Sequence, residues 1–551
     1  MNSRFTDNTA GHVRFVFRAL VFVLLLVVAL PGAMYAQQYS GTITGTVTDP
    51  AGAAVAGASV TATNVGTNAS YDSTTSDQGV FTFAQLPIGT YDLRVKTTGF
   101  KEFVSKGVEV HTSSVTEANV ALQLGSASEV VSVEASDVQV QTTTAEVGEV
   151  VSGTQVRELP LNGENFMGLV ILSPGVSAAN SFNSRDKGLT GGADFSVNGN
   201  PYNYNLFLVD GVNNNDVGSG RTILIYPSVD AIAEFKMIRN SYGPEYGQAA
   251  GAIISITTRS GENQFHGGLF YAGRNDKLDA NDWFSNFNGT GKAELRRNDW
   301  GYHVSGPILK DKLFFWWNQE WNREVRGQSV AACVPTAAEQ GGDFSTGFSG
   351  AAPPTAANPT GTLATDQCGA TQPAQWVGGV YTSLIPTAQQ STNPFVIANP
   401  DPAGTLIEKF YPLPNQALHN GDNWAASENL VPSWSEWNVR GDYDVSKMNR
   451  ITFRYTNDSW TSPGPNNTAF WGVSQFPTIN SDWSQPSKSV MAKLTTQLSN
   501  TMVNDVEFGY GHNAIITTLS GTEAGVVGQI NTAVPTAWPA SLKQSLSLIH
   551  I

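Results

Sequence analysis

The chain has 551 residues, enough for several domains, and its composition is unusual in one respect. Charged residues make up 14% of it, well below the roughly 25% of soluble domains, whereas hydrophobic residues make up an ordinary 40%. A chain that is poor in charge without being strongly apolar fits alternating strands better than transmembrane helices. The net charge of −15 gives no indication of a nucleic-acid partner.

Residues 1–36 have the pattern of an export signal. Arg4, Arg14 and Arg18 form a basic start, and residues 19–30 are an unbroken apolar run that stops at Pro31. Such a run fits the apolar part of a signal peptide and is short for a membrane span. A single N-terminal anchor is the alternative interpretation. A signal peptide would place the rest of the chain outside the cytoplasm.

Residues 37–124 are expected to form a β-sandwich. Short alternating segments, such as 41–48 and 91–95, are separated by turns rich in Gly and Pro. The order of motifs at 45–52, 57–60, 77–81 and 86–93 resembles the carboxypeptidase regulatory-like family, which is grouped with carbohydrate-binding-like folds. The resemblance implies a fold and an adhesion role rather than peptidase activity, because this module carries no zinc ligands. A passive spacer is the alternative.

Residues 125–150 form a polar connector that contains one alternating segment. The segment consists of Glu129, Val130, Val131, Ser132, Val133, Glu134 and Ala135. It resembles a TonB box, which binds an energy-coupling partner by adding an extended strand to the edge of that partner's sheet. The alternative is that this segment is the last strand of the preceding sandwich, and the sequence leaves both interpretations open.

Residues 151–262 are expected to form an α+β plug domain. Two apolar runs, 231–238 and 251–257, flank a turn whose glycines are expected to allow positive φ, and β-branched residues favour a strand in the second run. An apolar strand at 207–209 precedes them and ends at Asp210 and Gly211. The order LVDGV, IAEFKMI and YGQAAGAIISITTR resembles the plug of TonB-dependent outer-membrane receptors. The details are most similar to the Oar-like branch, whose members carry an extra N-terminal domain.

Residues 263–551 are expected to form the first part of a transmembrane β-barrel. Seven segments alternate between an apolar and a polar face, and Trp and Tyr lie near their ends. Short turns at 309–312, 446–449 and 499–501 are separated by long connections at 275–299, 323–433 and 457–486. Plugged barrels of this kind have about 22 strands, so the sequence is expected to be truncated at its C-terminal end.

Few residues are candidates for chemistry. Cys333 and Cys368 are the two cysteines, and a disulfide between them is expected because they follow an export signal. The sequence contains no Gly-x-Ser-x-Gly or His-Glu-x-x-His motif, so neither an enzyme nor a metal or cofactor is expected. Residues 210–216 resemble a calcium loop but lack its glutamate, which favours a turn. Trp316 and Trp317 are interpreted as residues of the aromatic girdle.

The predicted fold class is therefore mainly β, with a sandwich, an α+β plug and a partial antiparallel barrel. The resemblance implies a receptor in the cell outer membrane that takes up a bulky solute. Its implied partners are a TonB-like energy-coupling protein in the periplasm and outer-membrane lipid, and siderophore, oligosaccharide and peptide stay open as solutes. The alternative is a surface or adhesion protein that binds glycans through its sandwich and outer loops. A secreted enzyme related to carboxypeptidases is disfavoured by the missing metal ligands.

Overall fold

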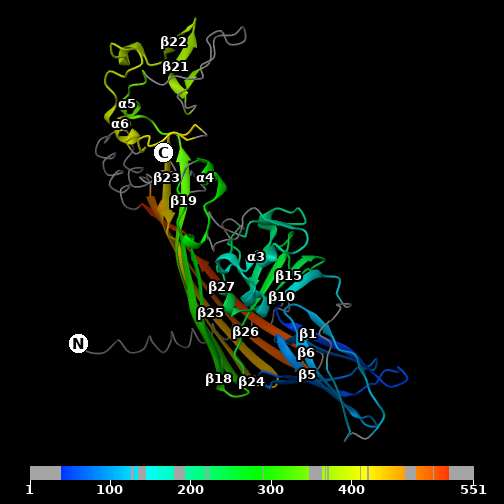
Figure 1. The fold of residues 1–551 in the computed structure, drawn as a ribbon. Coiled ribbons are helices and arrows are strands. Elements are labelled where there is room, and N and C mark those ends of the chain that lie inside the picture. Colours follow the sequence, from blue (N-terminus) through cyan, green and yellow to red (C-terminus); the bar gives the residue numbers. More distant parts are fainter. Residues whose placement is uncertain are drawn as a thin grey trace, which may run out of the picture.

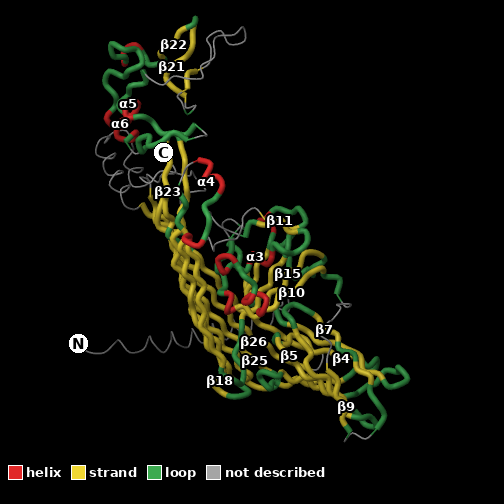
Figure 2. Tube along the Cα trace, in the orientation of Figure 1, coloured by secondary structure: helices red, strands yellow, loops and turns green. Residues whose placement is uncertain are grey.

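The computed structural model describes residues 39–125, 129–134, 144–178, 193–216, 220, 222–288, 291–345, 363–365, 368, 371–409, 411–418, 421–465, 480–499 and 502–519. They form a mainly β structure with three parts, a sandwich, a plug and a long curved sheet (Figures 1 and 2). The expected export signal lies outside the described residues. Within them, no helix has both the length and the apolar character needed to cross a membrane.

The first part is a two-sheet sandwich, as the sequence predicts. Its strands are β1 (Gly41–Thr48), β2 (Ser59–Asn64), β3 (Ser70–Thr74), β4 (Val80–Leu86), β5 (Gly89–Lys96), β6 (Glu102–Val110), β7 (Val115–Glu117), β8 (Val120–Ala121) and β9 (Val130–Glu134). One sheet has the order β4-β1-β7, with β8 also on β1, and the other has the order β3-β2-β5-β6-β9. Alternate residues such as Ile43 and Leu93 are fully buried between the sheets, so the sandwich has a core of its own.

The predicted connector, residues 125–150, differs from the expectation. Val130–Glu134 is strand β9, which pairs in parallel with β6 at the edge of a sandwich sheet. The end of the connector, from Val147 onward, is strand β10 of the plug. Both segments are rich in Val, whose branched side chain suits a pleated sheet better than a coil. The residues between them, 135–143, lie outside the described part of the chain.

The second part is the plug, built around one five-stranded sheet. Its elements are β10 (Val147–Ser152), α2 (Gly153–Glu158), η1 (Asn162–Glu164), α3 (Met167–Val170), β11 (Val176–Ala178), β12 (Phe195–Val197), η2 (Tyr202–Tyr204), β13 (Leu206–Val209), β14 (Val212–Asn213), η3 (Val229–Ala231), β15 (Ile232–Asn240) and β16 (Ile253–Thr258). The sheet order is β10-β15-β16-β13-β14. Every residue of the central strand β16 is buried, because the sheet is covered on both faces. This explains why β-branched residues run through it without alternation.

The glycines of the turn between β15 and β16 do not have the predicted role of allowing positive φ. In the described turn, the positive φ falls on Ser241, at 55°, and not on Gly243, Gly247 or Gly251. A Cβ added to Gly251 would lie 2.4 Å from Oδ1 of Asn205. Gly251 is therefore needed for close approach of two chain segments and not for its backbone angles.

The third part is a curved antiparallel sheet. Its elements are β17 (His266–Asn275), η4 (Asp276–Leu278), α4 (Trp283–Asn288), β18 (Leu295–Leu309), β19 (Leu313–Ala332), α5 (Ala337–Gln340), β20 (Leu363–Thr365), β21 (Thr371–Val377), β22 (Val380–Ser383), η5 (Thr387–Gln389), α6 (Pro402–Glu408), β23 (Trp424–Leu430), β24 (Ser433–Ser446), β25 (Asn449–Pro465), β26 (Asn480–Ser499), β27 (Met502–Asn513) and β28 (Ile516–Leu519). The main strands pair in the order β17-β18-β19-β24-β25-β26-β27, as expected for consecutive barrel strands.

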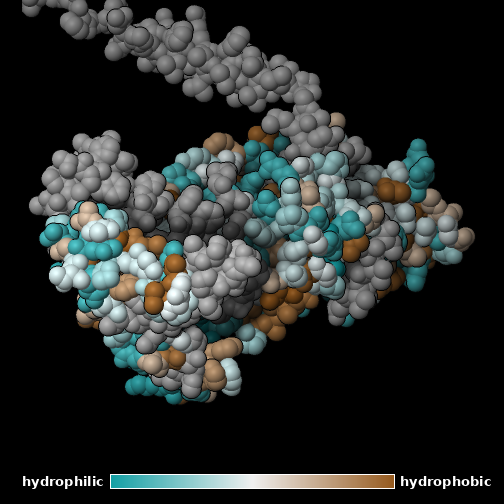
Figure 3. Space-filling model, turned by 90° about the horizontal axis from the view of Figure 1, so that it is seen from above, coloured by the Kyte–Doolittle hydropathy of each residue, from teal (hydrophilic) through white to brown (hydrophobic). Residues whose placement is uncertain are grey.

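The two faces of this sheet differ as the alternation predicts. On the outer face, apolar side chains are open, and Leu269 and Phe508 are 88% and 62% exposed. On the inner face, polar side chains such as Asn318, Arg454 and Ser487 are buried. Apolar side chains, in brown, therefore form patches on the surface in Figure 3 instead of being enclosed. Such a pattern suits a sheet with lipid on one side and a plugged lumen on the other.

The connection between β19 and β24, within the predicted long connection 323–433, contains secondary structure of its own. It contains helices α5 and α6, the small sheet β20-β21-β22, and β23, which lengthens the sheet by pairing with β19. Cys333 and Cys368 form a disulfide here, with their Cα atoms 5.6 Å apart. This region and the sandwich lie at opposite ends of the sheet, with the plug between them (Figure 1).

The sandwich contacts the short turns of the sheet. Nδ2 of Asn68 donates a hydrogen bond to Oδ1 of Asp311, in the turn between β18 and β19, at 2.9 Å. Nε2 of Gln497, near the turn between β26 and β27, donates to the carbonyl oxygen of Asp72 at 3.3 Å. The sandwich is therefore on the side of the short turns, which face the periplasm in barrels of this type.

The separate core predicts that the sandwich folds alone, and that β9 adds to its stability. Residues 39–134, expressed alone, should give a soluble β-protein that melts cooperatively. Residues 39–125 should melt roughly 5 °C lower, because losing an edge strand that is largely exposed costs about 1 kcal/mol. Circular dichroism melting curves measure both. A disordered spectrum for the longer polypeptide, or identical melting temperatures, would contradict the prediction.

Candidate plug–barrel interface

The plug contacts the inner face of the sheet through a buried carboxylate, that of Asp210. Strand β13 ends at this residue, and Asp210 and Gly211 turn the chain with φ of 46° and 83°. The carboxylate is fully buried and accepts hydrogen bonds from the backbone N and the Oγ1 of Thr258, at 2.9 and 2.7 Å. These bonds join the end of β13 to the end of the neighbouring strand β16, so the plug presents one rigid anionic group.

Two arginines of the barrel sheet pair with this carboxylate. Nε of Arg454, on β25, lies 2.8 Å from Oδ2 of Asp210, and Nη1 of Arg440, on β24, lies 3.4 Å from Oδ1. Arg440 also donates to the carbonyl oxygen of Thr258 at 2.7 Å, and Arg454 donates to that of Val209 at 3.2 Å. Both guanidinium groups are buried, so this network is shielded from water and from salt.

A second carboxylate, Asp442, extends the network along β24. Its Oδ2 accepts from Nε of Arg440 at 2.9 Å and from the Oγ of Ser260, just after the plug sheet, at 2.6 Å. Its Oδ1 lies 3.0 Å from Nη2 of Arg450. The charges therefore alternate in sign across the interface, and each buried ion has an opposite partner. Removing one member of such a network costs about 3–5 kcal/mol, because its partner stays buried and uncompensated.

Aromatic and polar contacts hold the plug at two further points. The guanidinium of Arg259 lies 4.4 Å over the ring of Trp316, which stacks on His303 at 5.0 Å, and Nδ1 of His303 is 3.1 Å from Oδ2 of Asp230. The interpretation of Trp316 as a girdle residue is thus wrong, because its ring faces inward and is fully buried. Trp317, the next residue, faces the other side, because side chains alternate along a strand.

The sandwich is attached to the plug by a second polar junction. Nδ1 of His111 donates to Oε2 of Glu234 at 2.8 Å, and the backbone N of Thr112 donates to the other carboxylate oxygen. Nζ of Lys236 contacts the carbonyl oxygen of Ser113 at 2.5 Å and pairs with Glu146 at 2.8 Å. The hydrogen bond to Glu234 raises the pKa of the His111 imidazole above its usual range, although burial opposes this shift.

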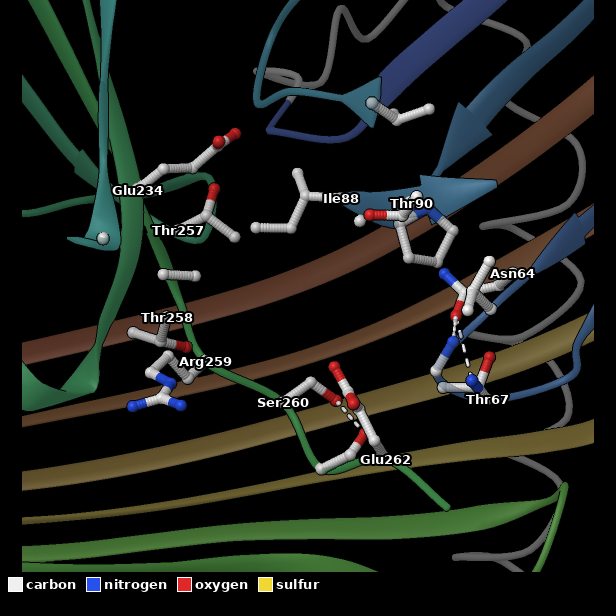
Figure 4. Close-up of a pocket in the computed structure, with 18 of the residues that line it drawn as sticks. Asn64, Thr67, Ile88, Thr90, Glu234, Thr257, Thr258, Arg259, Ser260 and Glu262 are labelled. Atoms are coloured by element: carbon white, nitrogen blue, oxygen red, sulfur yellow. Dashed lines mark hydrogen bonds between the residues drawn. The ribbon is translucent and has the colours of Figure 1, made fainter. Parts of the chain in front are cut away.

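A cavity of about 850 Å³ separates the sandwich, the plug and the barrel sheet beside this junction. Figure 4 shows Asn64 and Thr90 of the sandwich on one side and Glu234 and Arg259 of the plug on the other. The lining combines polar and apolar groups and is partly open to solvent. The cavity lies on the short-turn side of the plug.

The predicted TonB-box-like residues lie away from the plug network. Residues Glu129 to Glu134 are at the outer edge of the sandwich, with Val130 and Val133 exposed, and Nζ of Lys101 pairs with Glu129 at 2.7 Å. Ala135 lies outside the described residues. The pairing with β6 has the geometry of the alternative interpretation, the last sandwich strand. Among the described strands, the other edge of β9 has no neighbour and could pair with a further strand, and the coupling role stays a prediction.

Sequence reasoning missed the residues that hold the parts together. Arg440 and Arg454 were recognisable as charges on the polar face of alternating strands, but nothing in the sequence indicated that Asp210 was their partner. The described residues include no group of three or more His, Cys, Asp or Glu placed to hold a metal ion. Residues 210–216 instead supply Asp210 to the ion-pair network.

The chain is similar to several known proteins. It matches the family described as outer membrane beta barrel domain over residues 257–548, more than half of its length, and the family described as carboxypeptidase regulatory-like domain over residues 42–123. It is 30% identical over 267 residues to the TonB-dependent transporter Oar of Myxococcus xanthus, which covers 46% of this chain and 24% of that protein. The chain therefore spans about a quarter of the length of this curated relative.

The similarity of this chain to solved structures is weaker. The outer membrane transporter YddB from Escherichia coli has a TM-score of 0.36 at 12% identity, covering 64% of this chain and 37% of that one. The ferric-catecholate import receptor Fiu from E. coli K12 has a TM-score of 0.32 at 13% identity, covering 69% of this chain and 50% of that one.

The ion-pair network predicts that the Asp210→Asn variant loosens the plug. The substitution keeps the size of the side chain but leaves two buried guanidinium groups without their anion, at a cost of about 3–5 kcal/mol. Calorimetry of the purified protein should show the plug unfolding at a lower temperature. The control is Asp77→Asn, at an exposed sandwich position, which should change stability by less than about 0.5 kcal/mol. Equal unfolding temperatures of the plug in the two variants would exclude a central role for Asp210.

The His111–Glu234 bond predicts a pH dependence of the junction. Because folding raises the pKa of His111, this bond stabilises the junction fully below the unfolded pKa of about 6.5 and loses its contribution as pH rises through the folded pKa. The thermal transition of the sandwich within the whole protein should therefore fall between pH 6 and pH 8. The His111→Gln and Glu234→Gln variants should both reduce this fall. A slope that survives both substitutions would show that other groups cause it.

Proposed function

We propose that this chain, which belongs to the outer membrane beta barrel domain family, serves an energy-coupled transporter that takes up a bulky solute. It is a protein of the outer membrane and is homologous to a TonB-dependent transporter. The observation that carries the proposal is the ion pairing of Asp210 in the plug with Arg440 and Arg454 of the barrel wall. A plug held in this way blocks the lumen until work is done on it.

The strength of the plug attachment supports the need for energy. Separating the Asp210 network would leave buried charges unpaired at about 3–5 kcal/mol for each partner removed, so thermal opening would be rare. A solute that binds on the loop side contributes energy only through contacts that differ between the closed and open states. An external pull would supply the rest of the free energy needed to move the plug. Strand β9 is the segment that would receive this pull.

The position of β9 supports its role as the contact for a TonB-like partner in the periplasm. It lies on the short-turn side, its outer edge has no neighbouring strand in the described sheet, and its side chains are largely exposed. An added strand would therefore find a row of backbone donors and acceptors. Residues 135–146 connect β9 to β10, the edge strand of the plug sheet, so a pull on β9 would be transmitted along the chain to the plug.

The adhesion alternative receives less support. The sandwich contacts the turn end of the barrel sheet, whereas the long connections project from the opposite end (Figure 1). A glycan at the cell surface would meet the loops and not the sandwich. A sandwich at the turn end, joined to the plug through His111 and Glu234, suits coupling across the periplasm better than binding at the surface.

The β9 contact is tested by proline substitution. In the parallel ladder the N–H of Val131 is directed at β6, so the N–H of Ser132 is directed at the outer edge of β9. Ser132→Pro removes this outer donor and fixes φ, so it should reduce capture of the periplasmic domain of the host's TonB protein by at least about tenfold and stop energy-dependent uptake. Ser132→Thr keeps the backbone and should change capture by less than about twofold.

A matched proline separates coupling from sandwich stability. Ser70→Pro places proline in β3, the strand at the other edge of the same sheet, and should leave TonB capture unchanged. If Ser132→Pro transports normally, β9 is only the last sandwich strand and the coupling site lies elsewhere. If both prolines abolish capture, loosening of the sandwich is the cause.

A further inference from the structure

Three tryptophans face the inner side of the barrel sheet instead of lipid. Trp434 on β24, Trp460 on β25 and Trp483 on β26 contact one another and are 6%, 2% and 4% exposed. Trp434 is directly opposite Trp460 in the ladder, and Trp483 pairs with Ser462 two residues further along. A girdle residue would lie on the outer face, as Trp437 does in the same strand as Trp434. A role in the lipid girdle therefore does not explain these three side chains.

The cluster lies on the wall between the plug and the loops. The next inward residue on β24 is Glu436, whose Oε1 accepts a hydrogen bond from the backbone N of Ser228 in the plug at 3.0 Å. Trp434 is one position nearer the loop end of the same face, because inward residues are two apart. On the neighbouring wall the plug extends at least as far, because Oδ1 of Asn162 accepts from Arg274 and Arg297, so a solute arriving from the loop side would meet the three indoles beside the plug.

Polar atoms without partners lie beside the indoles. Among the described residues, the Nε1–H of Trp483 and both amide atoms of Gln485 are buried and make no hydrogen bond. Gln485 is fully buried, lies opposite Trp460 in the ladder and shares the face of Trp483. Leaving such a group unpaired costs about 1–3 kcal/mol. A ligand that brings both donors and acceptors would remove this cost, and two donors and one acceptor are available to it here.

Carboxylates surround the cluster on the neighbouring positions. Buried acids of β18, β19, β24 and β25 near this level are Asp299, Glu320, Glu324, Glu436 and Asp458. The inward guanidinium groups of this part of the described wall, those of Arg274, Arg297 and Arg326, lie beside Asp279, Asp299 and Glu324, at 3.4, 3.4 and 2.6 Å. A polyanionic iron complex would meet negative charge first. A neutral ligand with hydroxyl groups would instead donate hydrogen bonds to these oxygens.

We propose that Trp434, Trp460, Trp483 and Gln485 form a subsite for a neutral carbohydrate. A sugar ring has an apolar C–H face that packs on indole and an edge of hydroxyl groups that both donate and accept, which matches the unpaired amide and indole N–H. The indoles now cover one another, and a bound ring would replace part of this contact. The proposal rests on the proposed function for the route by which the sugar arrives, but binding itself needs no energy coupling.

The test uses the outer-membrane protein that carries this chain, purified in detergent. It is screened on an array of neutral oligosaccharides, and the tightest-binding sugar is titrated by calorimetry. Trp460→Ala should lower the affinity about tenfold and Gln485→Ala about fivefold, through lost stacking and lost hydrogen bonds. Trp460→Phe keeps a ring and should lose less than Trp460→Ala. Trp437→Ala, on the lipid face of the same sheet, is the matched control and should bind normally.

Several results would overturn the carbohydrate subsite. These are binding to no oligosaccharide on the array, unchanged affinity in both Trp460→Ala and Gln485→Ala, or binding of ferric siderophores in place of sugars. Unfolding curves of Gln485→Ala exclude a folding defect, since this side chain makes no hydrogen bond that the substitution would break. Ser132→Pro distinguishes this proposal from the coupling role of β9. Sugar binding that persists while Ser132→Pro transports normally would refute the coupling role of β9 and leave the subsite intact.

Discussion

The structure depends on one carboxylate shared between two parts of the chain. Asp210 closes the end of the plug sheet through Thr258 and at the same time neutralises Arg440 and Arg454 of the barrel wall. Without the plug, these guanidinium groups would face each other in a polar lumen, and without the wall, Asp210 would be an anion at the end of an apolar sheet. Each part therefore supplies the opposite charge that balances the buried charge of the other. This mutual dependence holds the plug inside the lumen without a covalent bond between them at this point.

The contacts that join the plug, the barrel sheet and the sandwich differ in how far they are buried. The ion pairs around Asp210 and Asp442 are buried, whereas the bond between His111 and Glu234 is partly exposed and the contacts of Asn68 and Asp72 with the barrel turns are on the surface. Exposed polar contacts contribute little, because water and salt compete with them. The junction of the sandwich with the plug also includes buried contacts, such as that of Nζ of Lys236 with the carbonyl oxygen of Ser113. It therefore combines buried and partly exposed contacts, whereas the contacts with the barrel turns are exposed.

Local sequence patterns predicted the fold well, but they could not predict contacts between residues that are far apart in the sequence. The alternation around Phe453 and Val506 was enough to assign barrel strands and their faces, and the LVDGV and ISITT strings were enough to place β13 and β16. The same patterns could not tell that Val131 pairs with Phe103, that Trp316 turns inward against Arg259, or that Asp210 meets Arg454. Those contacts depend on how separate sheets pack against each other, and such packing produces no repeating pattern in the amino-acid sequence. The short strands β20, β21 and β22 were not predicted, since they lack the length to show alternation.

The strict alternation of the barrel strands constrains how such a sequence can change in length. Deleting a single residue between Trp434 and Arg440 would turn every later side chain of β24 to the opposite face, placing Arg440 in lipid and Val439 beside the plug. Removing two residues would preserve the faces but shift every cross-strand partner. Insertions and deletions among related chains are therefore expected to collect in the 333–423 region, where added residues change neither the lumen nor the lipid surface. The barrel can thus acquire new outer loops while its wall keeps a fixed register.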